Sequence, residues 1–382
     1  MFFLINYQDN HFMWIVLLGL LLLYGLLLLY LYRGWERLPL FWHSGAVGAK
    51  FSIVVPFRNE EKNLRVLLAH LQQLHYPSES FEIILVNDNS TDRGPLVIEG
   101  ALKLGFKQNL KLINAQSKNG GYGKKVALEQ GIAVAKYPYI ITTDADCIMG
   151  RHWLQTYASF IETHQPDMLI GPVEFVSNGR IFDDYQALEF GSILGATLGA
   201  AGMQTPTMCN GANLVFRKEL FEKVGGYTGN FQYDSGDDMF LLHKFKAQPG
   251  VVIRGCKSSG ALIYTQPTKS FKDFFKQRSR WAAKGVGYTD IATIATGALV
   301  ASVNVAIVCA LVAGIFHQAT LLAAMIALIA KGAMDFPLIW KVTGFLRKRS
   351  LLWLYPSLAL MYPLYVVLSL FLSVFPFSRW KK

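Results

Sequence analysis

The sequence is poor in charged residues and in cysteine. Asp, Glu, Lys and Arg make up only 16% of the 382 residues, whereas hydrophobic residues make up 52%. Since a soluble domain is usually about one-quarter charged, this deficit indicates membrane-spanning segments besides a folded domain. There are four cysteines, and none belongs to a CxxC pair. Their spacing matches neither a zinc site nor a disulfide framework, so we expect reduced thiols in a domain that faces the cytosol.

Two ligand-binding patterns are also absent. The sequence contains no recognisable nucleic-acid-binding motif, so we expect no nucleic acid partner. The net charge of +11 then indicates anionic membrane lipids or phosphate-bearing ligands. The GxxxxGK(S/T) loop is missing too, which excludes the P-loop nucleotide-binding proteins.

The first hydrophobic run, residues 12–32, is long enough to cross a bilayer. The residues before it contain no Lys or Arg, whereas a signal peptide begins with a basic region. Arg33 and Arg37 follow the run instead. By the positive-inside rule, we expect residues 1–40 to form an uncleaved anchor in the cytoplasmic membrane, with its C-terminal end in the cytoplasm.

Residues 41–265 alternate short hydrophobic runs with amphipathic segments, and we expect them to form one catalytic domain on the cytoplasmic side. The runs predicted to be strands are 51–56, 81–87, 110–114, 139–144 and 167–173. Helical patterns such as 60–74 and 124–135 lie between them. This alternation predicts an α/β fold with a parallel sheet covered on both faces, whose ligands bind at the carboxyl ends of the strands.

The segment 266–290 predicts an amphipathic helix at the membrane surface. Its large side chains recur at helical spacing, with lysines around them. Gln277, Arg280 and Trp281 form a QxxRW motif in this segment. The indole can stack on an acceptor sugar and the guanidinium can pair with a diphosphate, or both can simply anchor the helix at the interface.

The remaining residues, 291–382, contain three more hydrophobic segments, at 291–315, 319–340 and 351–376. The loop KVTGFLRKRS between the last two is strongly basic and should be cytoplasmic. Three spans after the catalytic domain would place the basic tail FSRWKK outside, against its own charge. The last segment is therefore either a re-entrant hairpin, or the number of spans differs by one.

Two acidic pairs can carry chemistry. Asp144 and Asp146 come directly after the residues YIIT of the run at 139–144, and carboxylates at i and i+2 on a turn can face one divalent cation. Such a cation can neutralise a departing diphosphate, although a solvated turn is the simpler alternative. Asp237 and Asp238 open a helical segment, where the helix dipole favours acids in any case, or where one acts as a general base.

Polar residues follow the first two predicted strands as well. Pro56 ends the first, and Arg58 and Glu60 come just after it. Asp88 follows the second, where it can accept a hydrogen bond from a nucleobase or form an ordinary turn. The loop 118–125 is rich in Gly and Lys and precedes a helix, which is typical of a phosphate-adjacent loop or of a flexible one.

The order of these motifs resembles that of family 2 glycosyltransferases with the GT-A fold, over about residues 51–285. The hydrophobic flanks resemble those of its membrane members, such as cellulose, hyaluronan and poly-N-acetylglucosamine synthases and ceramide glucosyltransferases. The resemblance implies a Rossmann-like, mostly parallel sheet flanked by transmembrane helices. It also implies an inverting transfer from a nucleotide-sugar donor, usually a UDP-sugar, with Mg²⁺ or Mn²⁺ as cofactor.

The resemblance further implies a role for each candidate residue. The donor site would contain Pro56, Arg58, Glu60, Asp88, Lys124 and Asp144. Asp146 would bind the metal. Asp238 would be the catalytic base, beside Asp237, where the family often has Glu. The acceptor and the diphosphate would meet Gln277, Arg280 and Trp281.

Four predicted spans are few for a polymer channel, so we predict a membrane lipid or lipid-linked acceptor, with a processive polysaccharide synthase coupled to export as the alternative. A non-catalytic scaffold or sensor would show decay of the acidic motifs, and both are intact. A transporter is suggested by Lys331 and Asp335 in a hydrophobic segment. Their i,i+4 spacing favours a structural ion pair instead.

Overall fold

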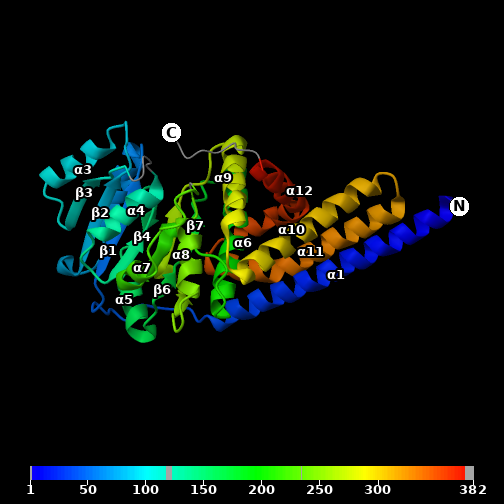
Figure 1. Ribbon diagram of the computed structural model, residues 1–382, viewed down its shortest axis with the longest axis horizontal. Helices are drawn as coiled ribbons and strands as arrows, with labels where there is room; N and C mark the ends of the chain where they lie inside the picture. Colours follow the sequence, from blue (N-terminus) through cyan, green and yellow to red (C-terminus); the bar gives the residue numbers. More distant parts are fainter. Residues whose placement is uncertain (1, 118–122, 234, 375–382) are drawn as a thin grey trace. The chain divides into compact units, whose positions relative to one another are not determined.

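The computed structural model describes residues 2–117, 123–233 and 235–374, with side chains from Trp14 onward (Figure 1). The chain folds into two compact units. The helical unit comprises the described residues of Met1–Glu36, Ser177–Thr207 and Thr268–Ser378, and the α/β unit comprises those of Arg37–Val176 and Met208–Pro267. The predicted continuous range 41–265 is therefore interrupted, because residues 177–207 fold with the helical unit.

A row of glycines explains why α6 (Ile181–Gly202) joins the helical unit. Gly195 packs against Val342 of α11 (Gln318–Phe345), where an added Cβ would lie 2.7 Å from a Val342 methyl carbon. A Cβ on Gly199 would lie 2.4 Å from the carbonyl oxygen of Leu31 in α1 (Phe2–Arg37). Small residues let helices approach this closely.

The described residues of the α/β unit form a seven-stranded sheet with the order β3-β2-β1-β4-β8-β6-β9. Its strands are β1 (Phe51–Phe57), β2 (Phe81–Asn87), β3 (Asn109–Asn114), β4 (Tyr139–Thr142), β6 (Met168–Ile170), β8 (Leu214–Arg217) and β9 (Ile253–Gly255). The first four strands pair in parallel, whereas β8 runs antiparallel to both β4 and β6. The predicted mostly parallel sheet is confirmed, with β8 as the reversed strand.

Helices cover both faces of this sheet. Gly131 of α4 (Lys124–Ala133) rests on Val54 and Val86, where a Cβ would lie 2.5 Å and 2.8 Å from their methyl carbons. Gly94, which begins α3 (Gly94–Lys103), lies against Phe57 instead. Because neighbouring strand residues point to opposite faces, Val54 and Phe57 face opposite ways. This explains why β1 and most of β2 are buried and why their sequences lack polar alternation.

The run predicted as one strand at 167–173 is two strands in different sheets. After β6 the chain turns at Gly171, where a Cβ would lie 2.0 Å from the Tyr157 hydroxyl oxygen. The next strand, β7 (Val173–Phe175), pairs with β10 (Ile263–Thr265), which also pairs with β5 (Ile148–Met149). The break follows from a close contact between distant residues, which the continuous hydrophobic pattern does not reveal.

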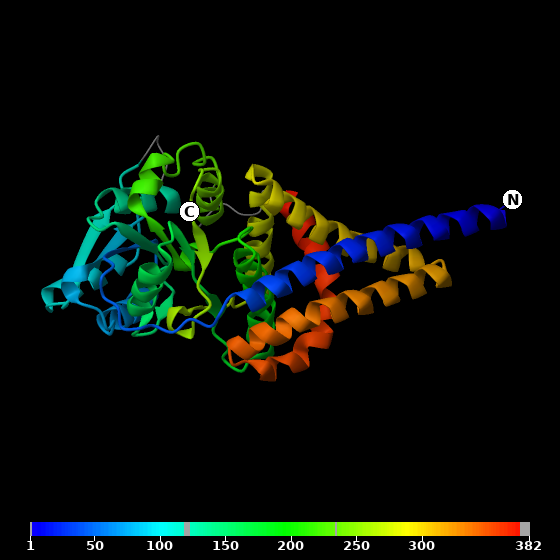
Figure 2. The same cartoon turned by 90° about the horizontal axis from the view of Figure 1, so that it is seen from below.

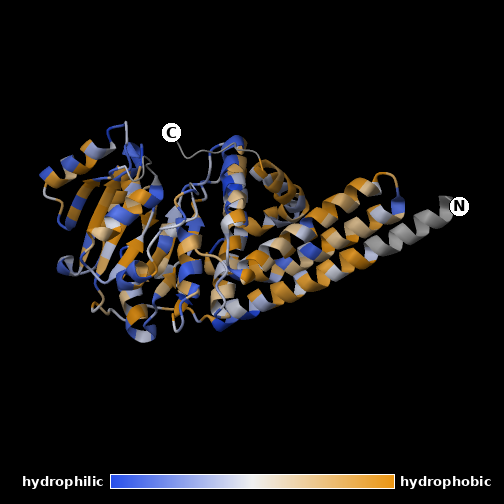
Figure 3. Cartoon of the chain, viewed as in Figure 1, coloured by the Kyte–Doolittle hydropathy of each residue, from blue (hydrophilic) through white to orange (hydrophobic). Residues whose placement is uncertain are grey.

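Four helices of the described chain are long and hydrophobic enough to cross a membrane, which agrees with the predicted number. They are Trp14–Arg37, Ile291–Gly314, Gln318–Phe345 and Arg349–Val374. Within the helical unit, α1 and α11 lie side by side with α10 (Ile291–Gly314) in both views (Figures 1 and 2). They share a core that includes Leu21, Ile307 and Ala324. Most of the residues of these helices are hydrophobic (Figure 3).

The last span is a single helix. Helix α12 (Tyr355–Val374) continues through Pro363, so the described residues do not form the re-entrant hairpin that the sequence left open. The tail FSRWKK, on which that alternative rested, lies outside the described residues.

Candidate active site

The two acidic pairs of the sequence are joined by one lysine. Asp144 follows β4, Lys124 begins α4, and Asp237 begins α8 (Asp237–Lys246). Lys124 Nζ lies 2.6 Å from Asp144 Oδ1 and 3.4 Å from Asp237 Oδ2. Burial works to lower the pKa of Lys124, but these carboxylates outweigh it and hold the pKa above its ordinary value, so the lysine is charged. Acids far apart in the chain thus form one site.

Asp238 is held by backbone N–H groups on both of its oxygens. Oδ2 accepts from Gly211 N at 3.2 Å and Oδ1 from Met239 N at 2.8 Å. Gly236, just before the helix, has φ of 87°, which favours glycine and sets the direction in which α8 starts. Asp237 is buried, whereas Asp238 is partly exposed. Of the two, Asp238 is therefore the one that a substrate can reach.

Gly211 contacts the second acidic pair, although the sequence did not single it out. It lies between β4 and α8, where its carbonyl oxygen accepts from Thr142 Oγ1 at 2.8 Å. An added Cβ would lie 2.8 Å from Asp237 Oδ2 and 3.6 Å from Lys124 Nζ. Only glycine fits while its N–H reaches Asp238. No local pattern predicts this contact, because the partners are distant in sequence.

Asp146 lies in a region of concentrated negative charge. Its Oδ2 accepts from Thr265 Oγ1 of β10 at 3.0 Å. Burial raises the pKa of Asp146 to about 6, and the neighbouring carboxylates of Asp144 and Glu60 add to the effect, whereas the Thr265 hydrogen bond opposes it. The site therefore favours a positive ligand beside Asp146.

The carboxylates of Asp144 and Asp146 are suitable ligands for Mg²⁺ or Mn²⁺ bound together with a phosphate. Magnesium takes one or two carboxylates and completes its shell with substrate phosphates and water. Among the described residues, no group of three or more His, Cys, Asp or Glu is arranged to hold a metal by itself. Asp144 and Asp146 thus fit as part of a coordination shell that a diphosphate would complete.

The residues after β1 and β2 leave two buried polar atoms without a hydrogen-bond partner in the described chain, Asp88 Oδ2 and Arg58 Nε. Asp88 Oδ1 accepts from Gly123 N at 2.9 Å. Burial raises the pKa of Asp88, and the Gly123 N–H and Arg58 oppose this only in part. Since buried polar groups are nearly always paired, these two atoms mark a place for a polar ligand. Residues 118–122 of the predicted phosphate loop lie outside the described residues.

Two more of the residues predicted to bind the nucleotide sugar, Pro56 and Glu60, lie at the carboxyl end of β1. Pro56 is buried in the strand, in register with Val86 of β2. Glu60 precedes α2 (Glu61–Gln72) and accepts from Asn63 Nδ2 at 2.6 Å. Asn59 ties the two loops together, because its Oδ1 accepts from Thr91 N at 2.7 Å.

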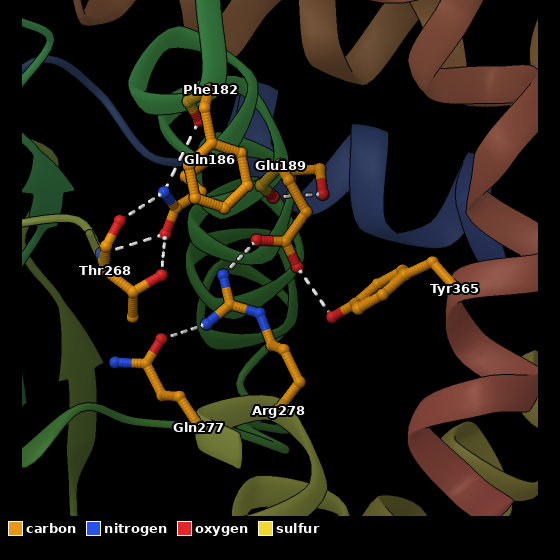
Figure 4. A network of polar contacts seen from close by, with 8 residues as sticks. Phe182, Gln186, Glu189, Thr268, Gln277, Arg278 and Tyr365 are labelled. Atoms are coloured by element: carbon orange, nitrogen blue, oxygen red, sulfur yellow. Dashed lines mark hydrogen bonds and ion pairs between the residues drawn. The ribbon is translucent and has the colours of Figure 1, made fainter. Parts of the chain in front are cut away.

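The QxxRW motif lies on α9 (Phe271–Ala283) in the helical unit. Between its named residues, Arg278 is buried and forms an ion pair with Glu189 of α6, as Figure 4 shows. Arg278 Nη1 also donates to Gln277 Oε1 at 2.6 Å, and its guanidinium lies 4.3 Å from the centre of the Trp281 ring. The acceptor role of Gln277, Arg280 and Trp281 stays a prediction.

The sheet and its acidic edge define a GT-A type α/β domain that can bind an activated, negatively charged donor. The model of the family "Glycosyl transferase family 2" matches residues 52–225, and that of "Glycosyl transferase family group 2" matches residues 139–377, more than half of the chain. The protein belongs to the family 2 glycosyltransferases, which confirms the predicted family and class of enzyme.

Relatives and a solved structure agree with this assignment. The chain is 35% identical over 133 residues to the poly(ribitol-phosphate) β-N-acetylglucosaminyltransferase TarS of Staphylococcus aureus, covering 34% of this chain and 22% of that one. It is 25% identical over 238 residues to the poly-β-1,6-N-acetyl-D-glucosamine synthase of Staphylococcus epidermidis, covering 61% and 54%. The chain thus spans about half of these relatives or less.

The solved structure of the mannosyltransferase PcManGT from Pyrobaculum calidifontis, in complex with GDP-Man and Mn²⁺, superposes with a TM-score of 0.59 at 18% identity. The superposition covers 96% of this chain and 100% of that one. At this identity the likeness establishes a shared fold.

Proposed function

We propose that the protein transfers a sugar from a nucleotide diphosphate sugar to a lipid or lipid-linked acceptor at the cytoplasmic face of the membrane, with inversion at the anomeric carbon. One observation carries the proposal: Lys124 contacts both Asp144 and Asp237. The pair assigned to the donor and the pair assigned to the base then belong to one site. A UDP-sugar is the first donor to test, since UDP is the usual donor nucleotide of the family.

In this proposal the donor lies along the carboxyl ends of β1, β2 and β4. Asp88 Oδ2 accepts a hydrogen bond from the nucleoside and Arg58 Nε donates one to it. Pro56 and Glu60 complete the nucleoside site. Asp146 would hold Mg²⁺ or Mn²⁺, which would supply positive charge against the diphosphate. The Lys124 ammonium group lies at Asp144 and adds a fixed positive charge there.

Asp238 then serves as the base. Its carboxylate takes the proton of the acceptor hydroxyl while the hydroxyl oxygen attacks the anomeric carbon from the face opposite the diphosphate. The new carbon–oxygen bond forms as the bond to the diphosphate breaks, and its electron pair leaves with the diphosphate. The N–H groups of Gly211 and Met239 keep the carboxylate in place during this step.

The helical unit supports a cytoplasmic site. Lys341 near the end of α11 pairs with Glu36 at the end of α1, with Nζ and Oε2 3.2 Å apart. The basic residues at the end of α1 and the basic loop after α11 therefore lie at the same end of the helical unit. The positive-inside rule assigns both to the cytoplasm. The α/β unit begins at Arg37, the last residue of α1, and thus at this same end of the helix.

A processive polysaccharide synthase is the second candidate. It is supported by the name of the relative from Staphylococcus epidermidis, a poly-β-1,6-N-acetyl-D-glucosamine synthase. The match covers only 54% of that protein, so its name alone does not identify the acceptor of this chain.

The test is a donor screen with purified full-length protein in membranes. Release of nucleotide diphosphate is measured for UDP- and GDP-sugars, with and without Mn²⁺, and the labelled product is sized. We expect one donor to give metal-dependent release and a lipid-extractable product that carries a single added sugar. A ladder of polymer would replace the first candidate by the second. If no donor is turned over under any condition, the proposed activity is wrong.

A further inference from the structure

Lys125 follows Lys124 directly, but it contacts the backbone of residues 230–235 instead of the acidic side chains. Its Nζ donates to three backbone carbonyl oxygens, those of Asn230 at 2.8 Å, Tyr233 at 2.7 Å and Ser235 at 2.9 Å. An ammonium group has three hydrogens, so one side chain satisfies three main-chain acceptors. Lys125 is only 4% exposed, and its Nζ also lies 4.9 Å from the centre of the Phe240 ring in α8.

The three carbonyls belong to the segment that leads into the second acidic pair. This segment ends at Gly236, whose left-handed backbone turns the chain into α8, and Asp237 and Asp238 are the first two helical residues. The carbonyls that Lys125 holds lie in neither a helix nor a strand, so no regular hydrogen-bond ladder fixes them. The position of Asp238 therefore depends on a segment in which one side chain holds three main-chain carbonyl oxygens.

The start of α4 thus acts on the second acidic pair in two ways. Lys124 contacts a side chain, the carboxylate of Asp237, and Lys125 contacts the backbone just before it. Both lysines come from the first turn of the same helix.

We propose that Lys125 is a positioning residue for the base: it fixes the segment before α8 so that Asp238 stays on the Gly211 N–H and in reach of the acceptor. The inference rests on the proposed function, because it assumes that Asp238 takes the acceptor proton. It predicts a defect in the chemical step and not in donor binding. A displacement of about 1 Å at a catalytic group can cost about 100-fold in rate.

Lys244 offers a matched control. Its Nζ also donates to three backbone carbonyls, those of Val224, Gly226 and Thr228, at 3.4, 2.7 and 2.8 Å. Like Lys125 it belongs to the α/β unit, but the carbonyls that it holds come earlier in the chain than the three that Lys125 holds. A substitution of Lys244 therefore measures the effect on stability of losing a lysine that bonds three backbone carbonyls.

The experiment compares Lys125→Met, Lys125→Arg and Lys244→Met in the full-length protein, using melting temperature, binding of UDP with Mn²⁺, and kcat and KM for sugar transfer. Hydrogen–deuterium exchange of a peptide spanning 230–236 reports on the held segment. For Lys125→Met we expect kcat about 100-fold lower, unchanged UDP binding and faster exchange. Lys244→Met should lower the melting temperature without changing kcat or the exchange of this peptide.

Lys125→Arg keeps the charge and tests the idea if Lys125→Met does not fold. A planar guanidinium cannot direct three N–H groups as an ammonium does, so we expect kcat between those of wild type and Lys125→Met. Wild-type kcat in both Lys125 variants would overturn the inference, as would equal losses of kcat in Lys125→Met and Lys244→Met. Asp238→Asn separates the two hypotheses: if it retains full transfer, the proposed function is wrong, whereas an inactive Asp238→Asn with an active Lys125→Met refutes only the role of Lys125.

Discussion

Arg278 of α9 and Glu189 of α6 form an ion pair inside the helical unit, with side chains only 2% and 1% exposed. Tyr365 of α12 donates to the second carboxylate oxygen at 3.1 Å, so three helices meet at Glu189 (Figure 4). Burial works to lower the pKa of Arg278, but Glu189 outweighs it and raises the pKa, which keeps the guanidinium charged. Gln277 and Trp281 contact this guanidinium. The ion pair thus orients two residues of the QxxRW motif.

We expect Glu189→Gln to destabilise the protein, because it leaves a buried guanidinium without its carboxylate. Breaking one partner of a buried pair costs about 3–5 kcal/mol, whereas replacing both with hydrophobic residues costs less. Thermal unfolding should therefore show a larger loss for Glu189→Gln than for Glu189→Leu/Arg278→Met. Arg65→Ala, which removes an exposed pair with Glu61, is the control and should change little. Equal effects of the single and double changes would contradict the idea of a coupled pair.

Asp238→Asn should abolish transfer and keep donor binding. The amide keeps the shape of the side chain and its contact with Gly211, but it cannot take a proton. General-base catalysis contributes about 10²–10⁴-fold, so kcat should fall by that order while the Kd of UDP with Mn²⁺ stays the same. Isothermal calorimetry and a transfer assay on the same preparation measure the two quantities. If the variant also lost UDP binding, Asp238 would be a residue of the donor-binding site instead of the base.

Asp146→Asn should weaken donor binding that depends on the metal. In the wild type, Mn²⁺ with UDP should raise the melting temperature, because a ligand that binds only the folded state stabilises it. The variant should lose most of this increase but keep the smaller one produced by UDP alone. An unchanged response to Mn²⁺ would remove Asp146 from the metal site.

The pH dependence of the ligand-free protein gives an independent test of the charge around Asp146. Its pKa is raised from 3.8 to about 6 in the folded state, so the folded protein binds a proton that the unfolded chain has already released between these values. The ionised carboxylate therefore destabilises the fold. This loss of stability builds up as pH rises from about 3.8 to about 6 and stays constant above that. Without ligand, Asp146→Asn should melt higher than wild type above this pH, and the difference should vanish in acid. A constant difference at all pH values would argue against the raised pKa.

The pair of Lys331 and Asp335 in α11 should be structural. Lys331 Nζ lies 2.8 Å from Asp335 Oδ2, and the hydroxyl of Tyr24 in α1 donates to Asp335 Oδ1 at 2.6 Å. Lys331→Ala should lower the melting temperature and leave the kcat of the folded protein unchanged. Lys341→Ala, which removes the exposed pair with Glu36, is the control. Loss of activity at an unchanged melting temperature would give Lys331 a functional role.

Local patterns sufficed for much of the fold. The run 81–87 was predicted as a strand and forms β2, because a short hydrophobic run between turn residues has few other stable conformations in a covered sheet. The hydrophobic segments predicted to span the membrane are the four long helices of the helical unit. The acidic motifs also stood at element boundaries, after β4 and at the start of α8, as their spacing indicated.

What the sequence alone determined was thus the kind of elements, their order and the residue types at their ends, since these follow from hydrophobic periodicity and turn chemistry over a few residues. Only the tertiary structure decided which distant groups share a contact: Lys124 between Asp144 and Asp237, Gly211 beneath Asp238, and Arg278 against Glu189. It also decided that residues 177–207 leave the α/β unit. The physical reason is that such contacts depend on packing between elements, where one missing Cβ or one buried charge selects the partner, and no local pattern encodes that choice.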